Sequence, residues 1–109
     1  MDVDETGVVV SAGPCKLASL YIYNNATTDR FFKMYDKATA ATAADTPIAT
    51  YVIPTRSGAV CNFIHREVPF NVGMSIRATT AVADNDTGAP GTNDVVVNLN
   101  TVENLQYTL

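Results

Sequence analysis

The amino-acid sequence predicts an all-β protein, an antiparallel β-sandwich of jelly-roll-like form with about seven or eight short strands. Apolar residues alternate with polar ones in short runs, which is the period of a strand with one buried face. Turn-forming residues separate these runs at regular intervals. Thr, Ala and Val dominate the composition, and the branched β-carbons of Thr and Val suit a pleated surface.

The chain is long enough for the core of one domain, because 47% of its 109 residues are hydrophobic. We expect residues 1–12 to form an N-terminal arm and residues 13–109 to form a single sandwich domain. Only 17% of the residues are charged, against about 25% in an average soluble domain. The low charge and the many apolar residues predict that part of the outer surface is covered by something else, for which a symmetric oligomer is one possibility.

The first half of the chain contains three predicted strands, at residues 7–11, 16–23 and 30–37. In the second of them Ala18, Leu20 and Ile22 share one face. The segment between the second and third strands is rich in Asn and Asp, whose side chains bond their own backbone in turns. These two strands are therefore expected to pair as a hairpin.

The second half adds predicted strands at residues 47–54, 59–64, 74–78 and 95–99, and a last short strand at 104–109. Pro47 and Pro54 cannot donate ladder hydrogen bonds, which predicts that their strand lies at a sheet edge or that the prolines stand at its ends. The strand at 74–78 alternates cleanly, so its polar side chains are expected to face solvent. The intervening residues 38–46 predict a loop, because their threonines disfavour a helix.

Charge and composition argue against several classes of partner. The net charge of −4 repels a phosphate backbone, and the seven basic residues are scattered, so nucleic-acid binding is not expected. No run approaches the roughly 18 apolar residues of a membrane span, and the acidic start differs from a secretory signal. Cys15 and Cys61 form no Cys-x-x-Cys pair, which favours two reduced thiols within strands over a disulfide bridge between them.

No arrangement of catalytic residues is recognisable, so we expect neither enzymatic activity nor a cofactor. The single histidine, His65, is predicted to lie in a loop or on the surface. Asp84, Asp86 and Gly88 resemble the start of a calcium-binding loop, but no glutamate stands where the last ligand belongs. We therefore expect no metal site here, but a tight loop whose side chains bond the backbone. Whether residues 84–94 also hold an ion stays open.

Four tyrosines fall on predicted strands, at Tyr21, Tyr23, Tyr35 and Tyr51. Exposed aromatic faces of this kind suit a carbohydrate-binding module, although the chain has no Trp. Tyrosines on strand faces more commonly pack at a core edge or a subunit interface, with the hydroxyl directed outward. The tyrosines therefore favour an interface over a sugar site.

Five stretches of the chain form a distinctive set: LYIYN at residues 20–24, FKMYDKAT at 32–39, DTP at 45–47, VADNDTGAP at 82–90 and NDVVVNL at 93–99. With these stretches the chain resembles small virion proteins of tailed bacteriophages. The resemblance covers roughly residues 15–100 and consists of packing and turn patterns. It carries no catalytic signature.

The resemblance implies a capsid decoration (cement) protein, which sits on the shell of the virion and ties capsomers together. Its partners would be the major capsid protein and further copies of itself, in the form of a trimer on the capsid surface. The alternative is a receptor-binding or carbohydrate-binding module on a tail or fibre. The resemblance identifies no contact residue.

Contacts with neighbouring subunits are expected from both ends of the chain and from two tyrosines. The apolar part of the arm and the C-terminal segment are suited to add a strand to a neighbour's sheet edge. Alternatively, both ends pair within their own subunit or fray. The expected contact residues are Val8, Val9, Val10, Tyr21, Tyr35, Leu105 and Tyr107.

Overall fold

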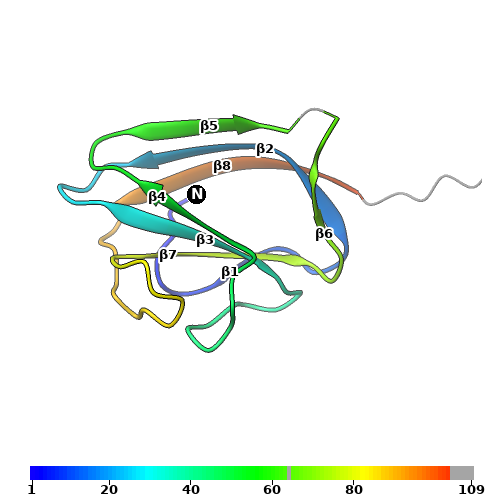
Figure 1. The fold of residues 1–109 in the computed structure, drawn as a ribbon, viewed down its shortest axis with the longest axis horizontal. Coiled ribbons are helices and arrows are strands. Elements are labelled where there is room, and N and C mark those ends of the chain that lie inside the picture. Colours follow the sequence, from blue (N-terminus) through cyan, green and yellow to red (C-terminus); the bar gives the residue numbers. More distant parts are fainter. Residues whose placement is uncertain (64, 104–109) are drawn as a thin grey trace, which may run out of the picture.

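The computed structural model describes residues 1–63 and 65–103, and its strands form two facing antiparallel sheets (Figure 1). The all-β sandwich predicted from the sequence is confirmed, with eight strands in the described part. In chain order they are β1 (Val8–Ser11), β2 (Cys15–Asn24), β3 (Arg30–Asp36), β4 (Ala49–Ile53), β5 (Gly58–Asn62), β6 (Val68–Phe70), β7 (Met74–Thr79) and β8 (Val95–Glu103).

One sheet has the strand order β1-β7-β3-β4, so β1 and β4 are its edges. The other sheet is built around β2, which pairs with β8 along one side. On its other side β2 pairs with β5 and β6 in succession, β5 at Ser19–Tyr23 and β6 at Cys15–Leu17. We call these two sheets the β7 sheet and the β2 sheet. The core lies between them and includes Leu20, Phe32 and Ile76.

The expected hairpin of residues 16–23 and 30–37 does not form, because β2 and β3 belong to different sheets. The turn between them crosses the sandwich around Asn24, which is 0% exposed. Its side-chain amide donates to the carbonyls of Thr28 (3.0 Å) and Ile53 (2.8 Å), while its oxygen accepts from the Ala26 amide (2.8 Å). A fully bonded buried amide thus holds the chain at the crossing point.

Strand β2 contains a bulge that changes which residues face the core. Its register against β8 shifts between Leu17 and Ser19, so Ala18 is an extra residue. As a result Leu17 and Leu20 are both buried, at 0% and 2% exposure, although they lie an odd number of positions apart. The expectation that Ala18 shares the core face was wrong, because it assumed a strict alternation of faces, which an inserted residue interrupts.

All six residues of β7 are buried, including Ser75 and Arg77, which were expected to face solvent. The outward side chains Ser75, Arg77 and Thr79 are covered by chain segments that lie over the sheet. The Ser75 hydroxyl accepts a hydrogen bond from the Ala41 amide (2.9 Å), which fastens the 38–46 loop onto the strand. Periodicity identified the inward face but could not show that loops cover the other one.

The segment 1–12 was expected to be an arm, but in the structure it is part of the sandwich. Val3 is 0% exposed and its amide donates to the Val95 carbonyl (2.9 Å), so the first residues extend the β2 sheet beside β8. The chain then passes to the β7 sheet, where β1 pairs with β7. Both sheets gain main-chain hydrogen bonds from the same short segment.

Other predictions hold. Strand β4 is an edge strand and residues 38–46 form no helix. The predicted strand at 95–99 forms part of β8, in which the alternate residues Val95 and Val97 face the core. Cys15 lies in β2 and Cys61 in β5, and both thiols are free. The last predicted strand, at 104–109, falls outside the described residues.

Candidate functional site

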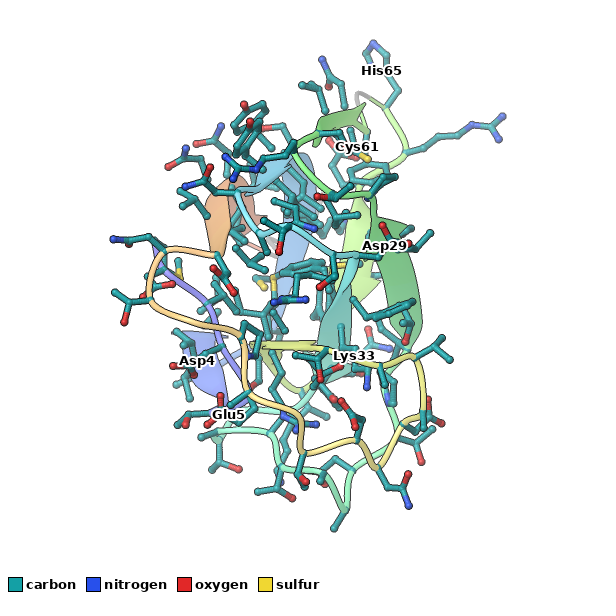
Figure 2. The ribbon with its side chains drawn as sticks, turned by 90° about the vertical axis from the view of Figure 1, so that its left-hand side faces the viewer. Asp4, Glu5, Asp29, Lys33, Cys61 and His65 are labelled. Atoms are coloured by element: carbon teal, nitrogen blue, oxygen red, sulfur yellow. The ribbon has the colours of Figure 1, made fainter. Side chains whose placement is uncertain are left out.

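The outer surface of the β7 sheet carries a cluster of buried polar side chains. We call this the covered face, defined by Lys33, Tyr35, Ser75, Arg77 and Thr79, each at most 1% exposed. The cluster lies beneath the loop 80–90 and the N-terminal segment. Figure 2 views the sandwich from the end at which this loop lies, with Lys33, Asp4 and Glu5 labelled. A polar cluster at this depth is stable only when its members find hydrogen-bond partners.

Arg77 connects the segments that lie over the covered face. Its Nε donates to the Glu5 carbonyl (2.7 Å), and its two terminal nitrogens donate to the Tyr35 hydroxyl (3.0 Å) and the Asp86 carbonyl (3.0 Å). One guanidinium therefore fastens the N-terminal segment and the 80–90 loop to the same strand. Its planar set of donors allows contacts in several directions at once.

Lys33 lies directly across the strand pair from Arg77, and its ammonium donates to the Ala83 carbonyl. Burial lowers the pKa of Lys33 below its usual value, and the positive charge of Arg77 lowers it further. Asp84 and Asp86 partly oppose this shift. The neighbouring cations Lys33 and Arg77 thus donate mainly to backbone carbonyls, and these bonds fasten the 80–90 loop to the sheet.

The loop at 84–94 bonds its own backbone, as the sequence predicts. The Asp86 carboxylate accepts from the amides of Ala81 (3.0 Å) and Gly88 (3.1 Å). The Asp94 carboxylate accepts from the Gly91 amide (2.7 Å) and forms an ion pair with Arg30 (3.1 Å). Their oxygens thus organise turns.

The outer surface of the β2 sheet differs, since its side chains reach solvent. We call it the open face. Lys16 is the only charged residue among its outward positions on β2, β5 and β8, as far as their side chains are described. Besides Lys16 and Gly58, those positions are occupied by Ser19, Tyr21, Tyr23, Val60, Asn62, Val96, Asn98, Asn100 and Val102.

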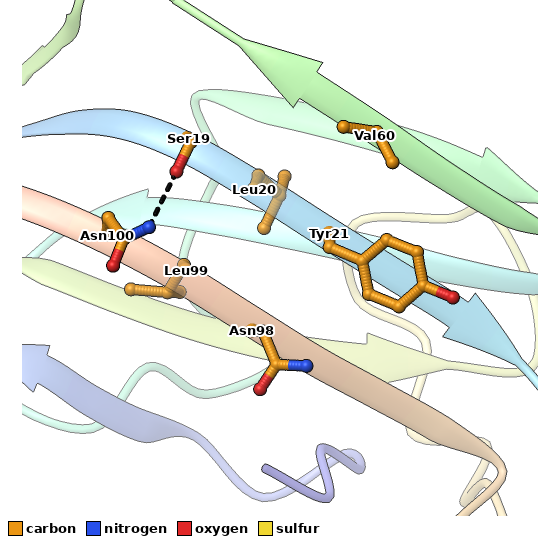
Figure 3. A pocket seen from close by; sticks show the side chains of 7 residues that line it. All are labelled: Ser19, Leu20, Tyr21, Val60, Asn98, Leu99 and Asn100. Atoms are coloured by element: carbon orange, nitrogen blue, oxygen red, sulfur yellow. Dashed lines mark hydrogen bonds between the residues drawn. The ribbon is translucent and has the colours of Figure 1, made fainter.

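A shallow hollow of about 320 Å³ lies on the open face. It is lined by Ser19, Leu20, Tyr21, Val60, Asn98, Leu99 and Asn100, which come from three adjacent strands (Figure 3). Its walls therefore combine one aromatic ring, aliphatic groups, amides and a hydroxyl. None of these seven side chains is charged.

A second accessible surface lies at the edge strand β4. Ile48, Tyr51 and Val52 are 49%, 36% and 54% exposed, a concentration of large apolar side chains within five positions. We call Ile48 to Val52 the apolar edge. Strand β4 pairs with β3 on one side and ends the sheet on the other. The signal in the sequence is that apolar residues at 47–54 occupy both faces of the predicted edge strand.

The seven expected contact residues have different positions. Tyr21 and Val9 are each 40% exposed and remain available for contacts. Val8 and Val10 pack against the core of their own subunit. Tyr35 is 1% exposed and bonded to Arg77, so its assignment to a surface interface was wrong. Leu105 and Tyr107 lie outside the described residues.

The residues with potential for chemistry are dispersed. His65 lies in an exposed turn, as predicted. Within residues 1–63 and 65–103, no three His, Cys, Asp or Glu side chains gather closely enough to hold a metal ion. The same part of the chain contains no helix long and apolar enough to cross a membrane.

Comparison of the chain with the models of known protein families, with curated proteins and with solved structures found no match. The open face and the apolar edge are the two accessible surfaces at which the described residues offer contacts to a partner.

Proposed function

We propose that this chain is a structural protein of a bacteriophage virion, a capsid decoration (cement) protein that binds the shell and stabilises it. The observation that carries the proposal is the apolar edge on β4. There, large apolar side chains and an open strand edge coincide. That combination suits the addition of a partner's strand.

An open edge strand presents main-chain donors and acceptors that readily pair with another chain. Many proteins prevent such pairing with charged side chains on the edge, yet Ala49 to Ile53 reads ATYVI and carries none. The exposed side chains of Ile48 and Val52 add apolar area, which marks a protein contact when it is concentrated on one element. Backbone pairing and apolar contact would therefore act together.

The prolines at both ends set the length of the contact. Pro47 and Pro54 flank β4 and cannot donate ladder hydrogen bonds. An added strand would therefore pair with about five residues and then diverge. Short, repeated contacts of this kind suit a cement protein, since many copies act together on one shell. The partners would be the major capsid protein and other copies of this chain at the capsid surface.

The resemblance to virion proteins and the small number of charged residues support the same role. Seven basic and eleven acidic residues in 109 leave much of the surface uncharged. Such a surface is stabilised when it is covered in an assembly. The role proposed here is binding, without a chemical step.

The test is the addition of purified protein to empty expanded shells built from the major capsid protein of the same phage. We expect saturation at a fixed stoichiometry and a higher melting temperature of the shells. Val52→Lys should weaken binding at least about tenfold, because it places a charge in the contact. Val102→Lys is the matched control, since Val102 is 44% exposed on β8 in the other sheet.

Circular dichroism of both variants would establish that each retains the fold. Wild-type protein that neither binds the shells nor raises their melting temperature would overturn the proposed role. Equal binding by Val52→Lys and wild type would overturn the apolar edge as the contact.

A further inference from the structure

The hollow on the open face is distinct from the apolar edge. Its lining residues come from β2, β5 and β8 of the β2 sheet, whereas the apolar edge belongs to the β7 sheet. A ligand in the hollow would lie across three strands and contact their outward side chains. It would make no use of a strand edge.

The polar groups in the hollow are available for a ligand. Asn98 and Asn100 are exposed and stand two positions apart on β8, so both side chains point outward, and their Cα atoms are about 6.8 Å apart along the strand. The Asn100 side-chain nitrogen donates to the Ser19 hydroxyl (2.9 Å), which fixes the orientation of this amide. Each amide supplies both a donor and an acceptor.

An aromatic ring lies beside these amides. Tyr21 is 40% exposed, and its cross-strand neighbours are Val60 on one side and Asn98 on the other. Figure 3 shows the Tyr21 ring between these two residues on the surface of the sheet. The hollow thus offers an apolar ring surface next to a row of neutral hydrogen-bonding groups.

This combination selects among classes of ligand. A charged ligand would find no opposite charge among the lining residues. A wholly apolar ligand would strip water from the Asn98 and Asn100 amides without replacing its hydrogen bonds, which is costly. The matching ligand is neutral, with C–H surface for the ring and hydroxyls for the amides.

We propose that the hollow binds a neutral saccharide, with one sugar ring on Tyr21 and its hydroxyls bonded to Asn98 and Asn100. Because the hollow is shallow and most of a sugar unit in it stays in contact with water, a single site has a dissociation constant of about 1 mM. Multiple copies on one particle would raise the overall affinity for a polysaccharide. The site does not depend on the shell-binding role.

The experiment is a titration of the isotope-labelled protein with maltose, cellobiose, mannobiose and chitobiose, monitored by amide chemical shifts. We expect at least one disaccharide to shift the Tyr21, Asn98 and Asn100 signals in a saturable manner. Asn98→Ala and Tyr21→Ala should each weaken that binding at least about tenfold. Asn62→Ala is the matched control, because Asn62 is an exposed amide of the same face outside the hollow.

The proposal is wrong if none of the four disaccharides shifts these signals at about 50 mM, well above the expected dissociation constant. It is also wrong if Asn98→Ala binds as wild type does. A third outcome is that Asn98→Ala and Tyr21→Ala bind every disaccharide as tightly as wild type but no longer bind the shells. The open face would then be a protein contact and not a sugar site. Val52→Lys distinguishes the two proposals, since this variant should bind the shells weakly and still bind the disaccharide as wild type does.

Discussion

The two sheets of this sandwich use their outer surfaces in opposite ways. On the β7 sheet, loops and the N-terminal segment cover a cluster that includes two cations, Lys33 and Arg77. On the β2 sheet, the outward side chains are almost all neutral and reach solvent. A polar side chain on a strand therefore does not by itself indicate an exposed face.

The covered face is expected to act in folding and the open face in recognition. Buried charged groups need partners throughout, and Arg77 obtains three from separate segments. Such groups make the loop arrangement specific. Neutral side chains on the open face need no partner within the subunit, so they remain free for one outside it.

The largest expected effect comes from removing the central cation of the covered face. Arg77→Met should lower the free energy of unfolding by about 3–5 kcal/mol, because it leaves the Tyr35 hydroxyl and two carbonyls unbonded in the interior. Urea denaturation measures the loss. Lys16→Met, the equivalent change on the open face, should alter it by less than about 0.5 kcal/mol. Equal losses would remove the distinction between the faces.

A smaller effect tests how closely the covering segments pack. A Cβ on Gly7 would stand 2.2 Å from the Ala41 carbonyl oxygen, so Gly7→Ala must displace the 38–46 loop. We expect a loss of about 1–3 kcal/mol in thermal unfolding. Gly13→Ala is the control, since a Cβ there has no atom within 4 Å, and it should be neutral or slightly stabilising. A neutral Gly7→Ala would show that the loop packs loosely.

The smallest effect concerns pH. Burial and the neighbouring Arg77 hold the pKa of Lys33 below 10.5, so in the window between the lowered pKa and 10.5 the unfolded chain binds more protons. The free energy of unfolding should therefore rise with pH there. Comparison with Lys33→Met across this window isolates the contribution, because other groups titrate in both proteins. A difference between the two proteins that is independent of pH would contradict the prediction.

Much of the fold was predictable, because a strand with one buried face gives its sequence an alternation of apolar and polar residues with a period of two. That period predicts the shared core face of Leu20 and Ile22 and of Val95 and Val97. The edge position of β4 follows from the two prolines that flank it, which lack a backbone donor. The pairing of β2 with β8 was not predictable. It joins Cys15 to Glu103, and local sequence carries no information about such distant partners.

The candidate site was predictable in part. Tyr21 was predicted to be a contact residue and lies on the surface, whereas Tyr35 has the same strand signature and lies beneath loops. The distinction depends on tertiary coverage, which periodicity does not record. The hollow needed the structure as well, since it brings Val60 and Asn98 to opposite sides of Tyr21. The apolar edge had a signal, since the residues at 47–54 are apolar on both faces.

The extra residue Ala18 affects how related proteins must be aligned with this chain. It places the two halves of β2 out of phase, so Leu17 and Leu20 share the interior although plain alternation would separate them. A related chain without this residue would keep the same interior with unbroken alternation. An alignment that forbids a one-residue gap at position 18 would therefore match inward residues to outward ones through half of the central strand.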